Sequence, residues 1–240
     1  MDLFLLILFC SGASFIQRVT GFGFGIFIMT VLPFLMPSYG EATTLSGLLA
    51  IALSFTIMVK YKHLIQWKKI IPILISFLLF SLLSIQYVTY VEDTILKQLL
   101  GGVLILLSIY FFFFCDKLHL RPTLTTQLSM GCISGIMGGL FAMQGPPAVL
   151  YFISAEKEKE KYMAMTQTYF LFGNLFMTIV RAANGYLTYS VAKGWLYACL
   201  GIIIGGFIGN KVFEKIKSDT LRKIVYVYMA LSGIVAIFTA

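Results

Sequence analysis

The chain has 240 residues, of which 59% are hydrophobic and only 12% are charged, and its mean hydropathy is +0.92. A soluble domain carries about 25% charged residues, so this composition excludes a soluble globular protein and predicts a polytopic membrane protein. The net charge of +8 comes from 18 basic and 10 acidic residues. Because the basic residues lie in short loops between apolar runs, we attribute this charge to membrane orientation and expect no nucleic-acid partner.

The first half of the chain contains four apolar segments. The first extends from Leu3 to Met36, which is longer than the roughly 20 residues that a spanning helix needs. Gly21, Gly23 and Gly25 interrupt it, and glycine at every second position disfavours a continuous helix. We therefore expect a steeply tilted helix or two half-helices that fold back on each other. The other expected helices of this half are residues 42–61, 70–87 and 94–114.

The second half, after a polar linker at residues 116–122, repeats this plan. Its first apolar segment covers residues 124–154 and is interrupted by the sequence Gln144-Gly145-Pro146-Pro147. Three further helices are expected at residues 162–183, 190–210 and 220–238.

Short matches between the halves indicate an internal duplication. Ala42-x-Thr44-x-Ser46 corresponds to Ala164-x-Thr166-x-Thr168, and Asp93-Thr94 corresponds to Asp219-Thr220. The two interrupted segments align in the same order, which strengthens the prediction of a repeat. The predicted domains are a first transmembrane repeat at 1–115, a cytoplasmic linker at 116–122 and a second transmembrane repeat at 123–240.

The loop charges favour one topology for the two long segments. If all eight segments cross the membrane once, the two sides carry seven and nine Lys and Arg residues, which is no bias. If the first and fifth segments are re-entrant hairpins, one side carries 14 and the other two. Because cytoplasmic loops are enriched in Lys and Arg, the hairpin arrangement is preferred. It predicts an all-α fold of two inverted four-element repeats, with both termini outside the cell.

Interruptions at corresponding places in two repeats are typical of transporter binding sites. Half-helix N-termini at such a point carry partial positive charge and bind anions. Neutral polar side chains on these and the other apolar segments suit hydrogen bonding to oxyanion oxygens, although interhelical hydrogen bonding is an equally good explanation for each one. The candidate substrate-binding residues are Gln17, Arg18, Thr20, Gly21, Gly23, Gly25, Thr44, Ser46, Gln144, Gly145, Pro146, Pro147, Thr166, Gln167, Asn174 and Arg181.

Two arginines and one glutamate have competing interpretations. Arg18 lies within the first apolar segment with no acidic residue near it in that segment, so either the substrate is its counter-ion or it snorkels to an interface. Arg181 lies near the end of its segment, where snorkelling is preferred. Glu41 could carry a coupling proton, but an interfacial helix cap is preferred.

The sequence contains no catalytic or nucleotide-binding motif. His63 and His119 lie in loops, and neither a P-loop nor a zinc-protease motif is present. The cysteines stand singly, so we expect neither metal nor cofactor. An intramembrane enzyme and a non-transporting membrane subunit remain as alternatives to a carrier.

The motifs at the two interruptions resemble the sulfite exporter TauE/SafE family over essentially the whole chain. They are Gly21-Phe22-Gly23-Phe24-Gly25 and the stretch from Gly138 to Phe152 with its Gly-Pro-Pro centre. The resemblance implies a small duplicated carrier of sulfite, organosulfonates or related anions, with residues 20–25 and 144–147 at the site. Ala142 and Gln144 depart from it, because the family usually has glycine there. It also implies a multi-pass protein of the bacterial plasma membrane whose partners are a small anion and the lipid bilayer, with a homodimer left open.

Overall fold

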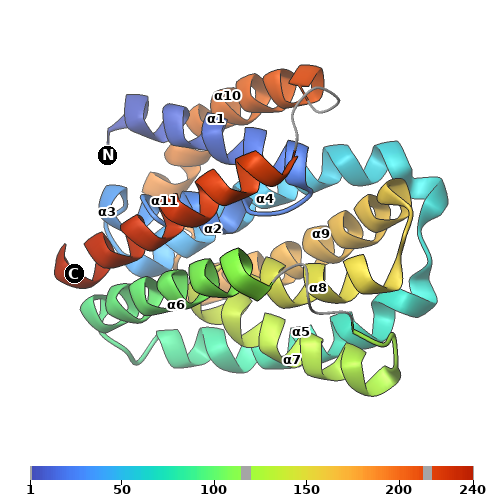
Figure 1. Cartoon of the computed structure of the whole chain (residues 1–240). Helices are drawn as coiled ribbons and strands as arrows, with labels where there is room; N and C mark the ends of the chain where they lie inside the picture. The colour runs from blue at the N-terminus through green and yellow to red at the C-terminus, as the bar shows by residue number, and fades with distance from the viewer. Residues whose placement is uncertain (1, 115–119, 213–217, 240) are drawn as a thin grey trace.

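The computed structural model describes residues 2–114, 120–212 and 218–239, so most of the predicted linker 116–122 lies outside the described residues. Within these ranges every regular element is helical (Figure 1). The elements are α1 (Leu3–Thr20), α2 (Phe24–Ile28), α3 (Leu32–Leu35), α4 (Tyr39–Tyr61), η1 (Lys62–Leu64), α5 (Trp67–Val88), α6 (Asp93–Phe114), α7 (Leu124–Phe141), α8 (Gly145–Ala155), α9 (Lys159–Ala183), α10 (Tyr189–Val212) and α11 (Ser218–Thr239).

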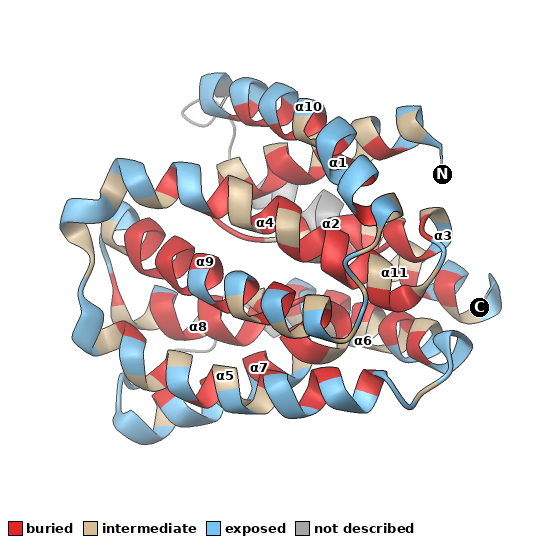
Figure 2. Ribbon diagram, turned by 180° about the vertical axis from the view of Figure 1, so that it is seen from behind, coloured by how far each residue is buried: buried red, intermediate tan, exposed pale blue. Residues whose placement is uncertain are grey.

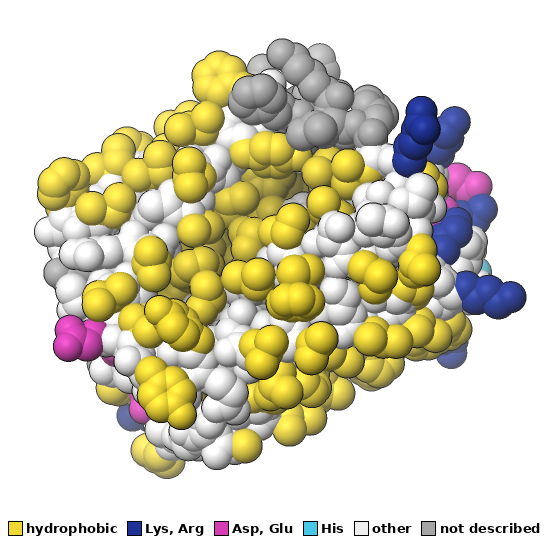
Figure 3. Space-filling view, turned by 90° about the horizontal axis from the view of Figure 1, so that it is seen from below, with side chains coloured by type: hydrophobic (Ala, Val, Ile, Leu, Met, Phe, Trp, Pro, Cys, Tyr) yellow, Lys and Arg dark blue, Asp and Glu magenta, His cyan; other side chains and the backbone are white. Residues whose placement is uncertain are grey.

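The helices follow the apolar segments closely. The two long segments are both divided, the first into α1, α2 and α3 and the fifth into α7 and α8. Five helices in the described residues are long and apolar enough to cross a membrane, namely Leu3–Thr20, Tyr39–Leu64, Trp67–Val88, Asp93–Phe113 and Tyr189–Lys211. The outer surface seen in Figure 3 is covered mainly by hydrophobic side chains, and Lys and Arg gather at one end of it. This surface suits a bilayer, and the prediction of an all-α polytopic membrane protein is confirmed at that level.

Burial separates central from peripheral helices (Figure 2). Helices α4 and α9 pack against each other, and most residues in the middle of each are buried. The threonine, glutamine and asparagine side chains of α9, the least apolar of the long helices, are buried and therefore face protein rather than lipid. Helices α5, α6 and α10 expose wide apolar faces. The bundle thus has a partly polar centre and an apolar exterior, as expected when lipid is the surrounding solvent.

The main helix pairs each join one half of the chain to the other. They are α1 with α10, α5 with α7, α4 with α9 and α6 with α11. Glycines allow two of these pairs to approach closely, because Gly131 of α7 lies against the Ile73 carbonyl of α5 and Gly201 of α10 lies against the Ile7 carbonyl of α1. Helices that come at the same place in the order of each half therefore make corresponding contacts.

Two ends of the bundle can be recognised from their contacts. We call the end formed by residues 60–69, 120–123 and 156–161 the basic end; Gln66 there donates its amide to the Met165 sulfur at 3.2 Å. We call the end formed by residues 36–41, 88–93 and 184–189 the opposite end; the Tyr39 amide there donates to Asp93 Oδ2 at 2.8 Å. Figure 1 shows the N-terminus and the C-terminus on the same side of the bundle.

Helix α7 begins at the basic end and runs parallel to α5, with Gly131 beside Ile73 and Gly139 beside Ser84. After the break, α8 returns to the basic end, where Glu156 follows its last turn. The fifth segment therefore enters and leaves at one end.

Helix α1 follows the reverse course. It runs parallel to α10, with Gly201 beside Ile7 and Gly209 beside Arg18, and it starts at the opposite end. After its break, α2 and α3 lead back to Ser38 at the opposite end (Figure 1). The first segment also turns back within the bundle, from the other side.

Candidate functional site

The first break is built from glycines with left-handed backbones. Gly21 has φ 85° and ends α1, its amide donating to the Gln17 carbonyl at 2.8 Å. Gly23 has φ 102° and precedes α2. Residues other than glycine rarely adopt these angles, so the glycine pattern in the sequence marks the point where the chain reverses.

At the second break the chain also reverses, but with different residues. Ala142 ends α7 with φ 56°, a left-handed conformation that is strained for alanine. Helix α8 restarts at Gly145, and Pro146 and Pro147 occupy its first turn, where a missing N–H costs little. The interruption expected at Gln144-Gly145-Pro146-Pro147 is therefore present, with a new helix beginning within it.

The two breaks meet in the centre of the bundle. A Cβ atom on Gly25 would lie 2.5 Å from the Ala142 carbonyl oxygen, so the two backbones are in direct contact. Beside this contact lies a cavity of about 30 Å³. Its lining comes from both breaks and from α4 and α9, namely Gln17, Gly23, Gly25, Ile26, Ala50, Ser54, Ala142, Met143, Gln144, Gly145, Phe170 and Asn174.

The cavity is small for a ligand. A volume of about 30 Å³ holds on the order of one water molecule, so the surroundings must move apart to admit a larger anion. Its polar lining groups include the side chains of Gln17, Ser54, Gln144 and Asn174. Neutral amides and a hydroxyl can donate hydrogen bonds to an anion without adding a fixed charge.

A glutamine pair ties the first break to α9. Gln17 Nε2 donates to Gln167 Oε1 at 3.1 Å, and Gln167 Nε2 donates to the Gly21 carbonyl at 2.7 Å. The Phe24 amide, the first of α2, donates to Gln17 Oε1 at 3.3 Å. Both side chains are at least 97% buried, so this network fixes the break against the second half of the chain.

A second network holds the other break. Tyr169 donates its hydroxyl to Ser134 at 2.7 Å, and Ser134 donates to the Gln144 carbonyl. Gln144 Nε2 donates to the Phe170 carbonyl at 3.2 Å, while its Oε1 atom is buried without a hydrogen-bond partner among the described residues.

The two arginines lie outside the cavity lining. Arg181 does not snorkel, because it is only 2% exposed and donates to the carbonyls of Gly138 and Gly139 at 2.9 and 3.0 Å. These carbonyls belong to the last turns of α7, where the helix dipole favours a cation. Arg18 donates to the Thr56 hydroxyl at 3.3 Å and lies beside Gly209 of α10. The geometry thus favours helix fixation for Arg181.

The remaining candidates serve local structure. Thr20 donates to the Ile16 and Phe22 carbonyls, and Thr44 donates to the Gly40 carbonyl. Four other candidates are buried but do not line the cavity, namely Ser46, Pro146, Pro147 and Thr166. Of the predicted residues, the structure brings Gln17, Gly23, Gly25, Gln144, Gly145 and Asn174 to the cavity.

Ser54 and Phe170 line the cavity and are absent from the sequence-based set. A signal for Ser54 exists, because Gly47, Ala50 and Ser54 follow helical spacing and form a small-residue stripe on α4. Phe170 offers no such signal, since an aromatic residue on an apolar helix is most often core.

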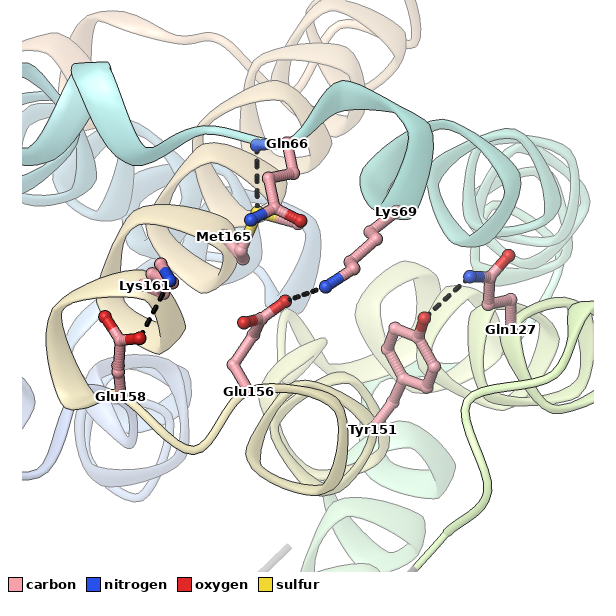
Figure 4. Close-up of polar contacts among 8 residues, drawn as sticks. All are labelled: Gln66, Lys69, Gln127, Tyr151, Glu156, Glu158, Lys161 and Met165. Carbon is pink, nitrogen blue, oxygen red and sulfur yellow. Dashed lines mark hydrogen bonds and ion pairs between the residues drawn. The ribbon is translucent and has the colours of Figure 1, made fainter.

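Polar contacts close the basic end of the bundle (Figure 4). Lys69 at the start of α5 pairs with Glu156 after α8 at 2.5 Å, and the Glu156 side chain is only 7% exposed. Glu158 pairs with Lys161 at 2.8 Å, and that hydrogen bond raises the pKa of the Lys161 ammonium. The first pair joins the two halves of the chain, whereas the second lies within one loop and the first turn of α9.

Comparison with known proteins decides the family. A sequence model described as "Sulfite exporter TauE/SafE" matches residues 4–236. The chain belongs to the TauE/SafE family. It is similar to a protein of Cupriavidus necator named "Probable sulfite/organosulfonate exporter TauE", with 22% identity over 220 residues, which cover 90% of this chain and 86% of that protein. No solved structure matches this TauE/SafE protein. The predicted resemblance is confirmed.

Proposed function

We propose that this TauE/SafE protein is a secondary transporter of small sulfur oxyanions such as sulfite or an organosulfonate. The observation that carries the proposal is the small cavity where Gly25 of one break meets Ala142 of the other. Family membership supports transport, and the name of the Cupriavidus necator relative supports the substrate class. The neutral hydrogen-bonding lining suits a small anion.

The protein works by alternating access in this proposal. In this proposal the two broken segments move apart at the cavity, where Gly25 of one meets Ala142 of the other. The two breaks approach the cavity from different ends of the bundle, which supports an arrangement of two inverted repeats. The Lys and Arg residues gathered at the basic end support a cytoplasmic location for that end (Figure 3).

The direct test is flux into proteoliposomes. Purified protein reconstituted in liposomes should take up labelled sulfite or a C2 sulfonate, and empty liposomes should not. Asn174→Leu removes a lining amide and should reduce flux, whereas Asn210→Leu, on an exposed position of α10, should leave it unchanged. Absence of flux for every sulfur oxyanion, with protein that remains folded, would refute the transporter proposal in favour of a non-transporting subunit.

Topology can be tested separately. In a cysteine-free background, Tyr90→Cys lies at the opposite end and Lys159→Cys at the basic end, and both positions are exposed. The inverted-repeat proposal predicts that a membrane-impermeant thiol reagent added to whole cells labels the cysteine at 90 and not the one at 159. Labelling of both from outside would contradict it.

A further inference from the structure

The cavity contains no charged side chain, which restricts the ligands that it can hold. Within the described residues, its lining is made of glycines, apolar side chains and four neutral polar residues. In water-poor surroundings an ion is costly to bury unless donors or opposite charge compensate it. The cost grows steeply with the charge of the ion, so the number of charges on the ligand becomes decisive.

Charged and titratable groups do occur on the elements around the cavity, but none of them lines it in the described part of the chain. They are Cys10 and Arg18 on α1, Tyr39, Glu41, Lys60 and Tyr61 on α4, Cys132 on α7, Tyr151 on α8, and Lys159, Glu160, Lys161, Tyr162, Tyr169 and Arg181 on α9.

Those nearest the centre are engaged with protein groups. Arg181 bonds to α7 carbonyls, Arg18 to Thr56, and Tyr169 to Ser134. The Tyr151 hydroxyl accepts a hydrogen bond from Gln127 Nε2 of α7 at 2.6 Å. The others lie in the terminal turns of their helices, apart from two cysteines. Cys10 is a buried thiol on the face of α1 toward α10, and Cys132 lies beside α5.

We propose, resting on the transporter function above, that the site accepts singly charged oxyanions and rejects dianions, so that sulfite is carried as hydrogensulfite. One negative charge spread over three oxygens can be compensated by neutral donors. A second charge would require a cation in the cavity, and none lines it among the described residues. Organosulfonates whose sulfonate is their only charged group satisfy the same rule because they are monoanions.

Ser54 supplies a new ligand for such an anion. It is completely buried on α4, lines the cavity, and its hydroxyl has no hydrogen-bond partner in the described part of the chain. An unpaired buried hydroxyl is costly, so it is expected to donate to whatever occupies the cavity. Ser54 thereby adds a donor from α4 to the amides of Gln17 and Asn174.

The proton then travels on the substrate. Hydrogensulfite carries its own proton across the membrane and releases it where the pH is higher, so no carboxylate of the protein has to bind and release one. A pH gradient can drive sulfite by this route, whereas a sulfonate, which carries no such proton, does not respond to it.

The test is binding as a function of pH to the full-length protein in detergent under nitrogen. Sulfite is titrated across the range where hydrogensulfite loses its proton, with methanesulfonate as a permanent monoanion and sulfate as a permanent dianion. The apparent affinity for total sulfite should fall about tenfold for each pH unit above the pKa of hydrogensulfite. Methanesulfonate should bind equally well throughout, and sulfate should not bind.

Each other outcome overturns the inference. A sulfite affinity that is flat or rises with pH, or sulfate that binds as well as methanesulfonate, would show that the site accepts dianions. If none of the three ligands binds at any pH, the proposed function itself fails and this inference fails with it.

The role of Ser54 is tested by substitution. Ser54→Ala should lower the affinity for hydrogensulfite and for methanesulfonate alike by about tenfold, whereas Ser129→Ala, at an exposed position of α7, should lower neither affinity. Equal affinities in Ser54→Ala and wild type would show that Ser54 does not contact the bound anion.

Flux gives an independent readout. In liposomes with an entrapped pH indicator, entry of sulfite should acidify the lumen and entry of methanesulfonate should not. Sulfite entry without acidification would show that the dianion is carried.

Discussion

Gly25 and Ala142 touch through their backbones, because a Cβ atom on Gly25 would come within 2.5 Å of the Ala142 carbonyl oxygen. This contact joins a break in the first half of the chain to a break in the second half. It explains why glycine is needed at position 25 even though its backbone angles are ordinary for a helix. Glycine is required there because a Cβ atom has no room beside Ala142, and not because of the backbone conformation.

Gly25→Ala should therefore separate the two breaks. We expect a loss of about 1–3 kcal/mol in the free energy of unfolding, which is usual for overpacking, together with loss of flux. Thermal unfolding in detergent and liposome uptake measure the two effects. Gly102→Ala is the matched control, since a Cβ there meets nothing within 4 Å and should leave stability equal or higher. A Gly25→Ala variant that matches wild type in both assays would show that the contact is unimportant.

The Gln17–Gln167 pair predicts energetic coupling between the two halves of the chain. Gln17→Leu and Gln167→Leu should each cost about 1–3 kcal/mol, because each leaves a buried amide unpaired. The double variant should cost less than the sum by at least roughly 0.5 kcal/mol. A double-mutant cycle on unfolding free energies measures this. Pairing Gln17→Leu with Gln86→Leu, at an exposed position of α5, provides the control and should be additive.

The left-handed backbone of Ala142 predicts that Ala142→Gly raises the free energy of unfolding. With φ 56° the alanine is in a region that costs it about 1–2 kcal/mol, whereas glycine adopts this conformation freely. After the larger chain entropy of glycine is subtracted, Ala142→Gly should gain up to about 1 kcal/mol and raise the unfolding temperature. Ala52→Gly, in the ordinary helical backbone of α4, should lower it instead. A decrease for Ala142→Gly would mean that the methyl group contributes more than the strain costs.

The fold was predictable from sequence to the extent that it depends on hydropathy. Long apolar segments set the helices to within a few residues, and the glycines and prolines located both breaks, because each alters the backbone by itself. The reversal at Ala142 had no such signal, since alanine is the best helix former. Only the contacts around it hold that residue in a left-handed conformation.

The candidate site was predictable only in part, for a related reason. Residues next to a break are placed near the cavity by chain connectivity, which applies to Gly23, Gly25, Gln144 and Gly145. Ser54 comes to the cavity through the packing of α4, and its sequence neighbours are ordinary for a membrane helix. Arg181 lies in a helix that was predicted, but its carbonyl partners on α7 belong to a tertiary contact that no local pattern encodes.

The Lys69–Glu156 pair predicts how the basic end opens. The pair joins α5 to the end of α8, and Glu156 is nearly buried, so removing Lys69 leaves a carboxylate without its partner. In the proposed alternating-access cycle, Lys69→Met should favour the state open at this end. A cysteine at position 54 should then react faster with a thiol reagent applied from the basic end, by on the order of tenfold. The charge swap of Lys69→Glu with Glu156→Lys should return the rate toward that of wild type. Lys161→Met breaks the exposed pair with Glu158 and should leave the rate unchanged, because exposed ion pairs contribute little. An unchanged rate in Lys69→Met would mean that this pair does not hold the basic end closed.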